Sequence, residues 1–185
     1  MKRIIALAAV IMLFFTACGK DEFDPETYIS PGQLSRYGMM VDTNQMMYND
    51  VFVLGHLDID ESAVFKKDGK TYAPVKSDIY KSYDILKGVL ETVYTDECVK
   101  DILETYDFYK DIDGVLCYDM SDADNTRTGT KWVRNPDIEA EVEEKEDGRC
   151  VLEYRFDCGK KDEIDEFEFV NTDKGYRLTA LQYVD

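Results

Sequence analysis

The residues able to do acid–base or metal chemistry are few in kind, because the chain has only one histidine. His56 would have to supply the imidazole of any Cys–His or Ser–His pair, and a multi-histidine zinc site is impossible. His56 follows Gly55 at the expected end of a helix, a position that favours a polar group satisfied at the helix terminus. No GxSxG, GxGxxG or phosphate-binding-loop sequence occurs. The sequence therefore predicts a protein that is not an enzyme and has no metal or cofactor.

Carboxylates gather in one polar loop, residues 119–131 (DMSDADNTRTGTK). Asp119, Asp122 and Asp124 are candidate calcium ligands. Counting Asp122 as the first ligand of an EF-hand, however, puts an arginine at the glycine position and a valine at the position of the bidentate acid. We therefore expect a solvated loop with at most loose cation binding. Trp132 closes the loop, either as an exposed aromatic contact or as a core residue.

The cysteines offer thiols or disulfides. Cys150 and Cys158 lie at opposite ends of an expected strand, about 26 Å apart if extended, which excludes pairing them with each other. Cys98 falls on the inner side of an expected helix and Cys117 within an apolar strand, so both resemble small core residues. We expect free buried thiols. One or two disulfides are the alternative, since an even number outside the cytoplasm is typical of bridges.

A fifth cysteine, Cys18, ends an export signal. Lys2 and Arg3 precede an apolar run over residues 4–15, too short to span a bilayer. The segment FFTAC places small residues before Cys18 and resembles the lipobox of bacterial lipoproteins, in which the cysteine becomes the lipidated N-terminus. We expect a signal peptide over residues 1–17 and a lipid anchor on Cys18 at the extracytoplasmic face of the membrane. An ordinary secretory signal is the alternative.

The balance of charge limits the partners. The chain has 39 acidic and 22 basic residues, a net charge of −17, which repels nucleic acid and anionic lipid and suits a basic protein. Residues 18–32 are polar and rich in turn formers, and are expected to form a flexible tether. An ordered arm packed through Phe23, Tyr28 and Ile29 is the alternative. Residues 33–185 are then enough for a single domain.

Three helices are expected in the first half of the chain. Ser30-Pro31 offers an N-cap and a proline at the first helical position, and the apolar spacing continues to Leu54. This segment is one long helix, or two broken near Asp42-Thr43. Ser82 and Thr95 are the expected N-caps of two further amphipathic helices.

Strands dominate the second half. Asp68-Gly69 indicates a hairpin between residues 63 and 75, and Asp113-Gly114 leads into a strand at 115–118. Alternating residues predict an antiparallel meander with strands at 138–144, 149–157, 164–170 and 176–184. The predicted fold is α+β, with N-terminal helices packed on a curved C-terminal antiparallel sheet.

Four short motifs carry a family resemblance. In chain order they are GKTYAPV at Gly69–Val75, YDILK at Tyr83–Lys87, VYTDE at Val93–Glu97 and IDGVLCY at Ile112–Tyr118. Their succession, followed by a tryptophan-bearing loop and a β-meander, resembles clostridial lipoproteins of the IseA-type D,L-endopeptidase inhibitor group over about residues 45–183. In outline it is also similar to nuclear transport factor 2-like and cystatin-like domains, in which helices pack into the concave side of a bent sheet.

The resemblance implies an inhibitor that occupies the cleft of a papain-like cell-wall endopeptidase through loop contacts. The acidic surface is compatible with a basic cell-wall hydrolase, since opposite charge speeds encounter. The candidate partner-binding residues are Asp119, Asp122, Asp124 and Trp132. We therefore expect a membrane-anchored, non-enzymatic binding domain that modulates or inhibits cell-wall D,L-endopeptidases. A binder of a small molecule or peptide, using a cavity between helices and sheet, is the alternative.

Overall fold

The structure is a computed structural model that describes residues 28–122, 129–135, 137–138, 140–158 and 162–183. The predicted signal peptide and Cys18 lie outside these residues. Within the described ranges, no helix combines the length and apolar character needed to cross a membrane.

Helix α2 (Pro31–Met46) begins as the sequence predicts. Ser30 Oγ accepts a hydrogen bond from the Gln33 amide at 3.3 Å, and Gln33 Oε1 accepts one from the Ser30 amide at 3.1 Å. The helix runs unbroken past Asp42-Thr43 and ends in a π-helical segment, Met47–Phe52, so the single long helix is confirmed. Ile29, which lies within the predicted tether, is buried in the core.

Helices α3 (Tyr83–Val93) and α4 (Asp96–Thr105) also begin where their caps predict. The side chain of Ser82 accepts from the Ile85 amide and that of Thr95 accepts from the Cys98 amide, each at 3.3 Å. Both helices are amphipathic and bury one face. The buried residues are Leu86, Leu90 and Val93 in α3 and Cys98, Val99 and Ile102 in α4.

A four-stranded antiparallel sheet has the order β1-β2-β4-β3, with β1 at Phe65–Lys67, β2 at Lys70–Pro74, β3 at Tyr109–Ile112 and β4 at Val115–Asp119. Both of its tight turns are Asp-Gly pairs with positive φ, at 68–69 and 113–114, as a type I′ turn requires. The 68–69 hairpin was predicted, whereas β3 was not recognised as a strand.

The second sheet has the order β5-β7-β8-β9, with β6 also paired to β7. Its strands are β5 (Val133–Arg134), β6 (Glu141–Glu146), β7 (Arg149–Asp157), β8 (Asp162–Thr172) and β9 (Gly175–Leu178). The predicted meander is confirmed, but its last strand ends at Leu178 rather than at residue 184. A register shift between Val142 and Glu144 bends β6.

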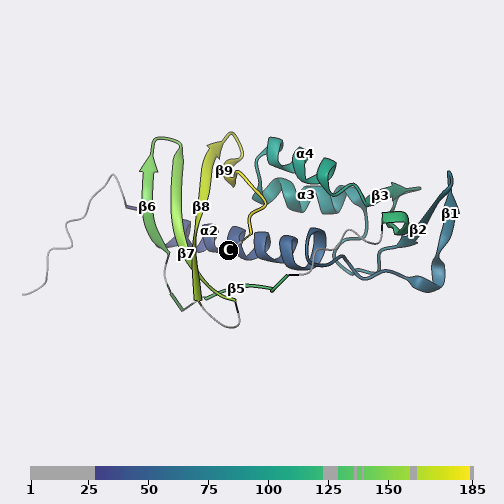
Figure 1. The fold of residues 1–185 in the computed structure, drawn as a ribbon. Coiled ribbons are helices and arrows are strands. Elements are labelled where there is room, and N and C mark those ends of the chain that lie inside the picture. The colour runs from purple at the N-terminus through teal and green to yellow at the C-terminus, as the bar shows by residue number, and fades with distance from the viewer. Residues whose placement is uncertain (1–27, 123–128, 136, 139, 159–161, 184–185) are drawn as a thin grey trace, which may run out of the picture.

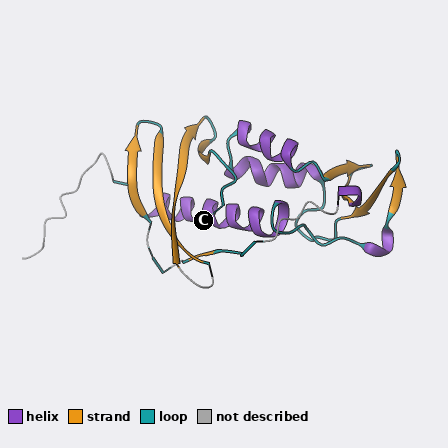
Figure 2. Cartoon of the chain, viewed as in Figure 1, coloured by secondary structure: helices purple, strands orange, loops and turns teal. Residues whose placement is uncertain are grey.

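The five-stranded sheet curls at one end of the molecule, the four-stranded sheet lies at the other, and α2, α3 and α4 lie between them (Figure 1). Figure 2 shows the same separation of strands and helices. One hydrophobic cluster includes residues of all three helices and of both sheets, for example Tyr37, Leu90, Leu116 and Phe169. The α+β class is therefore confirmed. The description of helices followed by a single curved sheet was incomplete, since the middle of the chain builds a sheet of its own.

Cys98, Cys117 and Cys150 are free buried thiols, as expected. Cys158 is partly exposed. Burial raises the pKa of Cys98 to about 11, so this thiol stays protonated at neutral pH and is a poor nucleophile.

Candidate functional site

A hollow of about 410 Å³ lies between helix α2 and the five-stranded sheet, and we call it the α2 groove. Helix α2 contributes Pro31, Leu34, Ser35, Gly38 and Met39 to one wall. The opposite wall consists of Arg134, Ile138, Ala140 and Tyr154. The α2 residues are spaced three and four apart, so they share one helical face. The volume and the lining of the groove are those of a small-molecule site, which is mostly apolar with a few polar groups.

Tyr154 is one of the residues that line this groove, and its side chain carries a buried hydroxyl. The residue is only 3% exposed, and no described residue forms a hydrogen bond with its hydroxyl. A buried hydroxyl without a partner costs about 1–3 kcal/mol. Burial raises the pKa of Tyr154 above its ordinary value, against a smaller opposing effect of Arg134. The phenol therefore keeps its proton and can donate a hydrogen bond.

Arg134 stands over Tyr154, with its guanidinium carbon 5.8 Å from the ring centroid. Asp42 holds it from α2: Arg134 Nε donates to Oδ1 at 2.6 Å and Nη2 donates to Oδ2 at 2.9 Å. Gly38 lies against this pair, since a Cβ at that position would be 3.4 Å from Arg134 Nη2. The pair is neutral overall, and only two of the five guanidinium N–H groups are used by Asp42.

Two other hollows are larger but less specific. One, of about 710 Å³, opens widely beside His56, Asp58 and Lys76. His56 itself is exposed, donates from Nδ1 to the Leu57 carbonyl at 2.8 Å and lies against the Tyr118 ring. The other, of about 490 Å³, lies between α3 and α4 and is lined by paired charges. Neither has an unpartnered buried polar side chain among its described residues.

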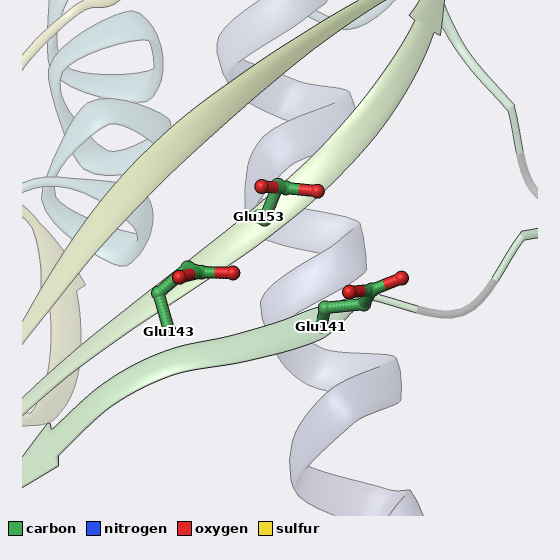
Figure 3. Close-up of side chains that lie close together, drawn as sticks. All are labelled: Glu141, Glu143 and Glu153. Carbon is green, nitrogen blue, oxygen red and sulfur yellow. The ribbon is translucent and has the colours of Figure 1, made fainter.

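Three glutamates form an acidic cluster on the face of β6 and β7 turned away from α2 (Figure 3). Glu141, Glu143 and Glu153 bring carboxylate oxygens within 4.8 Å of one another. Glu141 and Glu166 also flank Glu153 in register on the neighbouring strands. Desolvation raises the pKa of Glu153, and the charges of Glu143, Glu141 and Glu166 raise it further. Exposed carboxylates commonly gather in this way without an ion, so we assign no metal to them.

Neutralising Glu153 is expected to stabilise the protein. Like charges directly opposite each other on a sheet are destabilising, so Glu153→Gln should raise the Tm at pH 7. The pKa of Glu153 is higher in the folded than in the unfolded state. The ionised carboxylate therefore lowers the free energy of unfolding, and this loss is fully present above the folded pKa. It disappears as pH falls below the unfolded value of about 4.3. Thermal unfolding of both proteins between pH 7 and pH 3.5 should show the gain shrinking with acidity.

The matched control for this change is Glu104→Gln on α4, where the carboxylate pairs with Lys100 at 3.8 Å. Removing the negative charge of Glu104 should give no increase in Tm. Equal Tm values for Glu153→Gln and the wild type at pH 7 would show that solvent screens the cluster completely.

Two of the predicted partner-binding residues, Asp119 and Trp132, have buried side chains. Asp119 is buried at the end of β4, where it accepts hydrogen bonds from Lys70 Nζ at 2.6 Å and from the Ser121 amide at 3.0 Å. Trp132 is fully buried with its ring edge-on to Phe156. In the folded chain both side chains therefore serve the interior, and partner binding by the loop that contains them stays a prediction.

The other predicted site residues are not placed by the structure. Asp122 ends a short 3₁₀ segment, Met120–Asp122, and its side chain lies outside the described part of the chain. Asp124 and Cys18 also lie outside the described residues.

The sequence reasoning missed Tyr154 and Arg134. Tyr154 lies on the same face of β7 as Leu152 and Phe156, so its place along the strand does not distinguish it from a core residue. Only the absence of a hydroxyl partner distinguishes it, and this requires the positions of residues distant in the sequence.

No family model matches the chain. No curated protein matches it either. The functional inference therefore comes from the geometry described above.

Proposed function

We propose that this chain is an exported lipoprotein, anchored to the extracytoplasmic face of the membrane through Cys18, whose domain is a non-enzymatic binding module. The α2 groove is its binding site for a small molecule or peptide. The observation that carries this proposal is the buried, unpartnered hydroxyl of Tyr154 beside an open apolar hollow. In the same proposal the helices and curled sheet form a cystatin-like or nuclear transport factor 2-like cone.

The groove suits recognition by its composition. Its described lining includes aliphatic side chains for apolar contact, and two donors, on Tyr154 and Arg134, that fix the orientation of a ligand. Arg134 is held by Asp42, and Tyr154 is held by its ring contact with Phe167 at 5.8 Å. Donors held in place before the ligand arrives reduce the entropy lost on binding.

A groove-filling variant tests this function. Ser35 is an exposed residue of α2 at the groove wall, so Ser35→Trp should fill the hollow without disturbing the core. The full chain would be purified from the envelope and analysed by native mass spectrometry for bound ligand. We expect a ligand mass with the wild type and with the control Glu97→Trp, on the exposed face of α4, and none with Ser35→Trp. Retention of the same ligand by Ser35→Trp would overturn the assignment of the groove.

A second candidate is modulation of a basic cell-wall hydrolase, with a different contact surface from the one predicted. The acidic cluster of Glu141, Glu143 and Glu153 favours it, since opposite charge accelerates encounter. We expect the full chain to capture such a hydrolase from solubilised envelope at low salt and to lose it at high salt. The triple Glu→Gln variant should capture none. Capture that is equal for both proteins at all salt concentrations would count against this candidate.

Lipidation at Cys18 gives a separate prediction. In a bacterial host that processes lipoproteins, the wild type should incorporate a labelled fatty acid and sediment with the membranes. Cys18→Ala should lose the label and move to the soluble fraction, whereas Cys158→Ala, at a partly exposed thiol, should behave as the wild type. A Cys18→Ala protein that keeps the label would refute the lipobox, and a wild type without label would favour the ordinary secretory signal.

A further inference from the structure

The α2 groove combines hydrogen-bond donors with very little net charge. Arg134 is neutralised by the bidentate contact with Asp42, at 2.6 and 2.9 Å. The chain as a whole carries a charge of −17, so its field opposes an approaching anion. A ligand with a carboxylate would therefore lose its hydration without a full countercharge in return.

The hydroxyl of Tyr154 lacks an acceptor. Among the described residues nothing bonds to it, although the ring is held between the Arg134 guanidinium and Phe167. The hydroxyl oxygen has almost no surface accessible to water in the free protein, so a ligand acceptor reaches it only by displacing the side chains that cover it, and then gains a full hydrogen bond. A carbonyl oxygen is the neutral acceptor that suits it best, since it offers two lone pairs to the Tyr154 O–H and a guanidinium N–H.

The remaining walls are apolar and partly open. Leu34, Met39, Ile138 and Ala140 line them, and Met39 is 67% exposed, so an apolar substituent entering the hollow would remove its side chain from water. Methionine adapts readily to such a substituent because its side chain is unbranched and polarisable. At about 410 Å³ the space is at the small end of ligand sites, which run from about 300 to 1,000 Å³.

We propose that the α2 groove binds a small uncharged amide with an apolar substituent, whose carbonyl oxygen accepts from the Tyr154 hydroxyl and whose substituent packs on Leu34 and Met39. This inference rests on the proposed function and specifies the ligand class of the same site. It assigns specificity to two features: the carbonyl acceptor and the absence of charge.

The first test compares two probes with the same apolar body. N-acetyl-leucine methylamide is neutral, and N-acetyl-leucine carries a carboxylate in place of the second amide. The full chain in lipid nanodiscs, with ¹³C-labelled methionine methyls, would be titrated with each. We expect the neutral probe to shift the Met39 signal and to bind more tightly than the acid. Tighter binding of the acid, or no shift of Met39 up to the solubility limit, would overturn the proposal.

The second test uses Tyr154→Phe. Loss of one hydrogen bond should weaken the neutral probe about three- to tenfold. Because the hydroxyl has no partner in the free protein, the Tm of the variant should equal or exceed that of the wild type, which a hydroxyl with a structural role would not allow. Tyr183→Phe, at a partly exposed tyrosine against Tyr48, is the control and should change neither value. Equal affinity of wild type and Tyr154→Phe for the probe would overturn the role of the hydroxyl.

The two proposals fail separately. A ligand that co-purifies with the wild type, is lost in Ser35→Trp and contains no amide would overturn the ligand class and leave the binding function standing. Absence of any groove-dependent ligand, together with no binding of the neutral probe, would overturn both.

Discussion

Trp132→Ala is expected to destabilise the protein by about 3–5 kcal/mol, the usual cost of truncating a fully buried large aromatic side chain. Trp132 is edge-on to Phe156 with ring centroids 4.8 Å apart. Its carbonyl accepts from the side chain of the buried Asn49 at 2.8 Å, so the backbone is fixed as well. Domains of this size have a total stability of about 5–15 kcal/mol, so the variant should be largely unfolded at modest urea concentrations.

Urea unfolding followed by circular dichroism measures this loss, since the chain has no other tryptophan to report it by fluorescence. The control is Val133→Ala at the next residue, which is mostly exposed and should change the stability by less than about 0.5 kcal/mol. In the wild type the emission of Trp132 should be blue-shifted and protected from acrylamide. If Trp132→Ala lost less than about 1 kcal/mol of stability, and acrylamide quenched the wild-type emission, Trp132 would be an exposed aromatic contact, the alternative that the sequence left open.

The features that sequence analysis predicted are those with local causes. Ser30, Ser82 and Thr95 begin helices because each side chain bonds to an amide three residues later, a geometry written in consecutive residues. Asp68-Gly69 was predicted as a hairpin turn because its residue types tolerate the required backbone conformation. The alternation of apolar and polar residues along β7 likewise depends only on neighbouring residues, so it predicted which face of the strand is buried.

The missed features depend on residues far apart in the chain. β3 has the sequence YKDI, too short and too charged to be recognised, and is a strand because it pairs with β4 across Asp113-Gly114. Asp119 looked like a loop residue because its partner, Lys70, is 49 positions away. The α2 groove could not be predicted at all, because it depends on where α2 crosses the sheet and on which side chain lacks a partner there.

The ion pair of Asp119 gives the second large effect. The Asp119 side chain is 1% exposed and that of Lys70 is 48% exposed, so the carboxylate is inside and the ammonium group is at the surface. Removing the cation leaves a buried charge with only its Ser121 contacts. Lys70→Met should therefore destabilise the protein by about 2 kcal/mol at pH 7. This is less than for a pair buried on both sides, because water reaches Lys70.

The pH dependence of this loss has a definite sign. Burial alone would raise the pKa of Asp119, but hydrogen bonds from Lys70 and Ser121 outweigh it and the pKa is lowered. In the wild type Asp119 therefore contributes stability above the unfolded value of about 3.9, and this is lost as pH falls through the lower folded value. In Lys70→Met the hydrogen bond and charge of Lys70 are gone, so we expect burial to outweigh the remaining Ser121 hydrogen bonds and to raise the folded pKa of Asp119. The variant should then recover stability as pH falls from 7 towards 4.

Urea unfolding at several pH values between 7 and 3 measures both curves, and the difference between wild type and Lys70→Met should be largest at pH 7 and smallest at pH 3. Lys67→Met on the same hairpin is the matched control. Lys67 pairs at 3.2 Å with Asp113, whose side chain is 84% exposed, so its loss should cost less than about 0.5 kcal/mol and should not reverse the slope. Parallel curves for wild type and Lys70→Met would mean that Asp119 is solvated, and its place in a partner-binding loop would again be open.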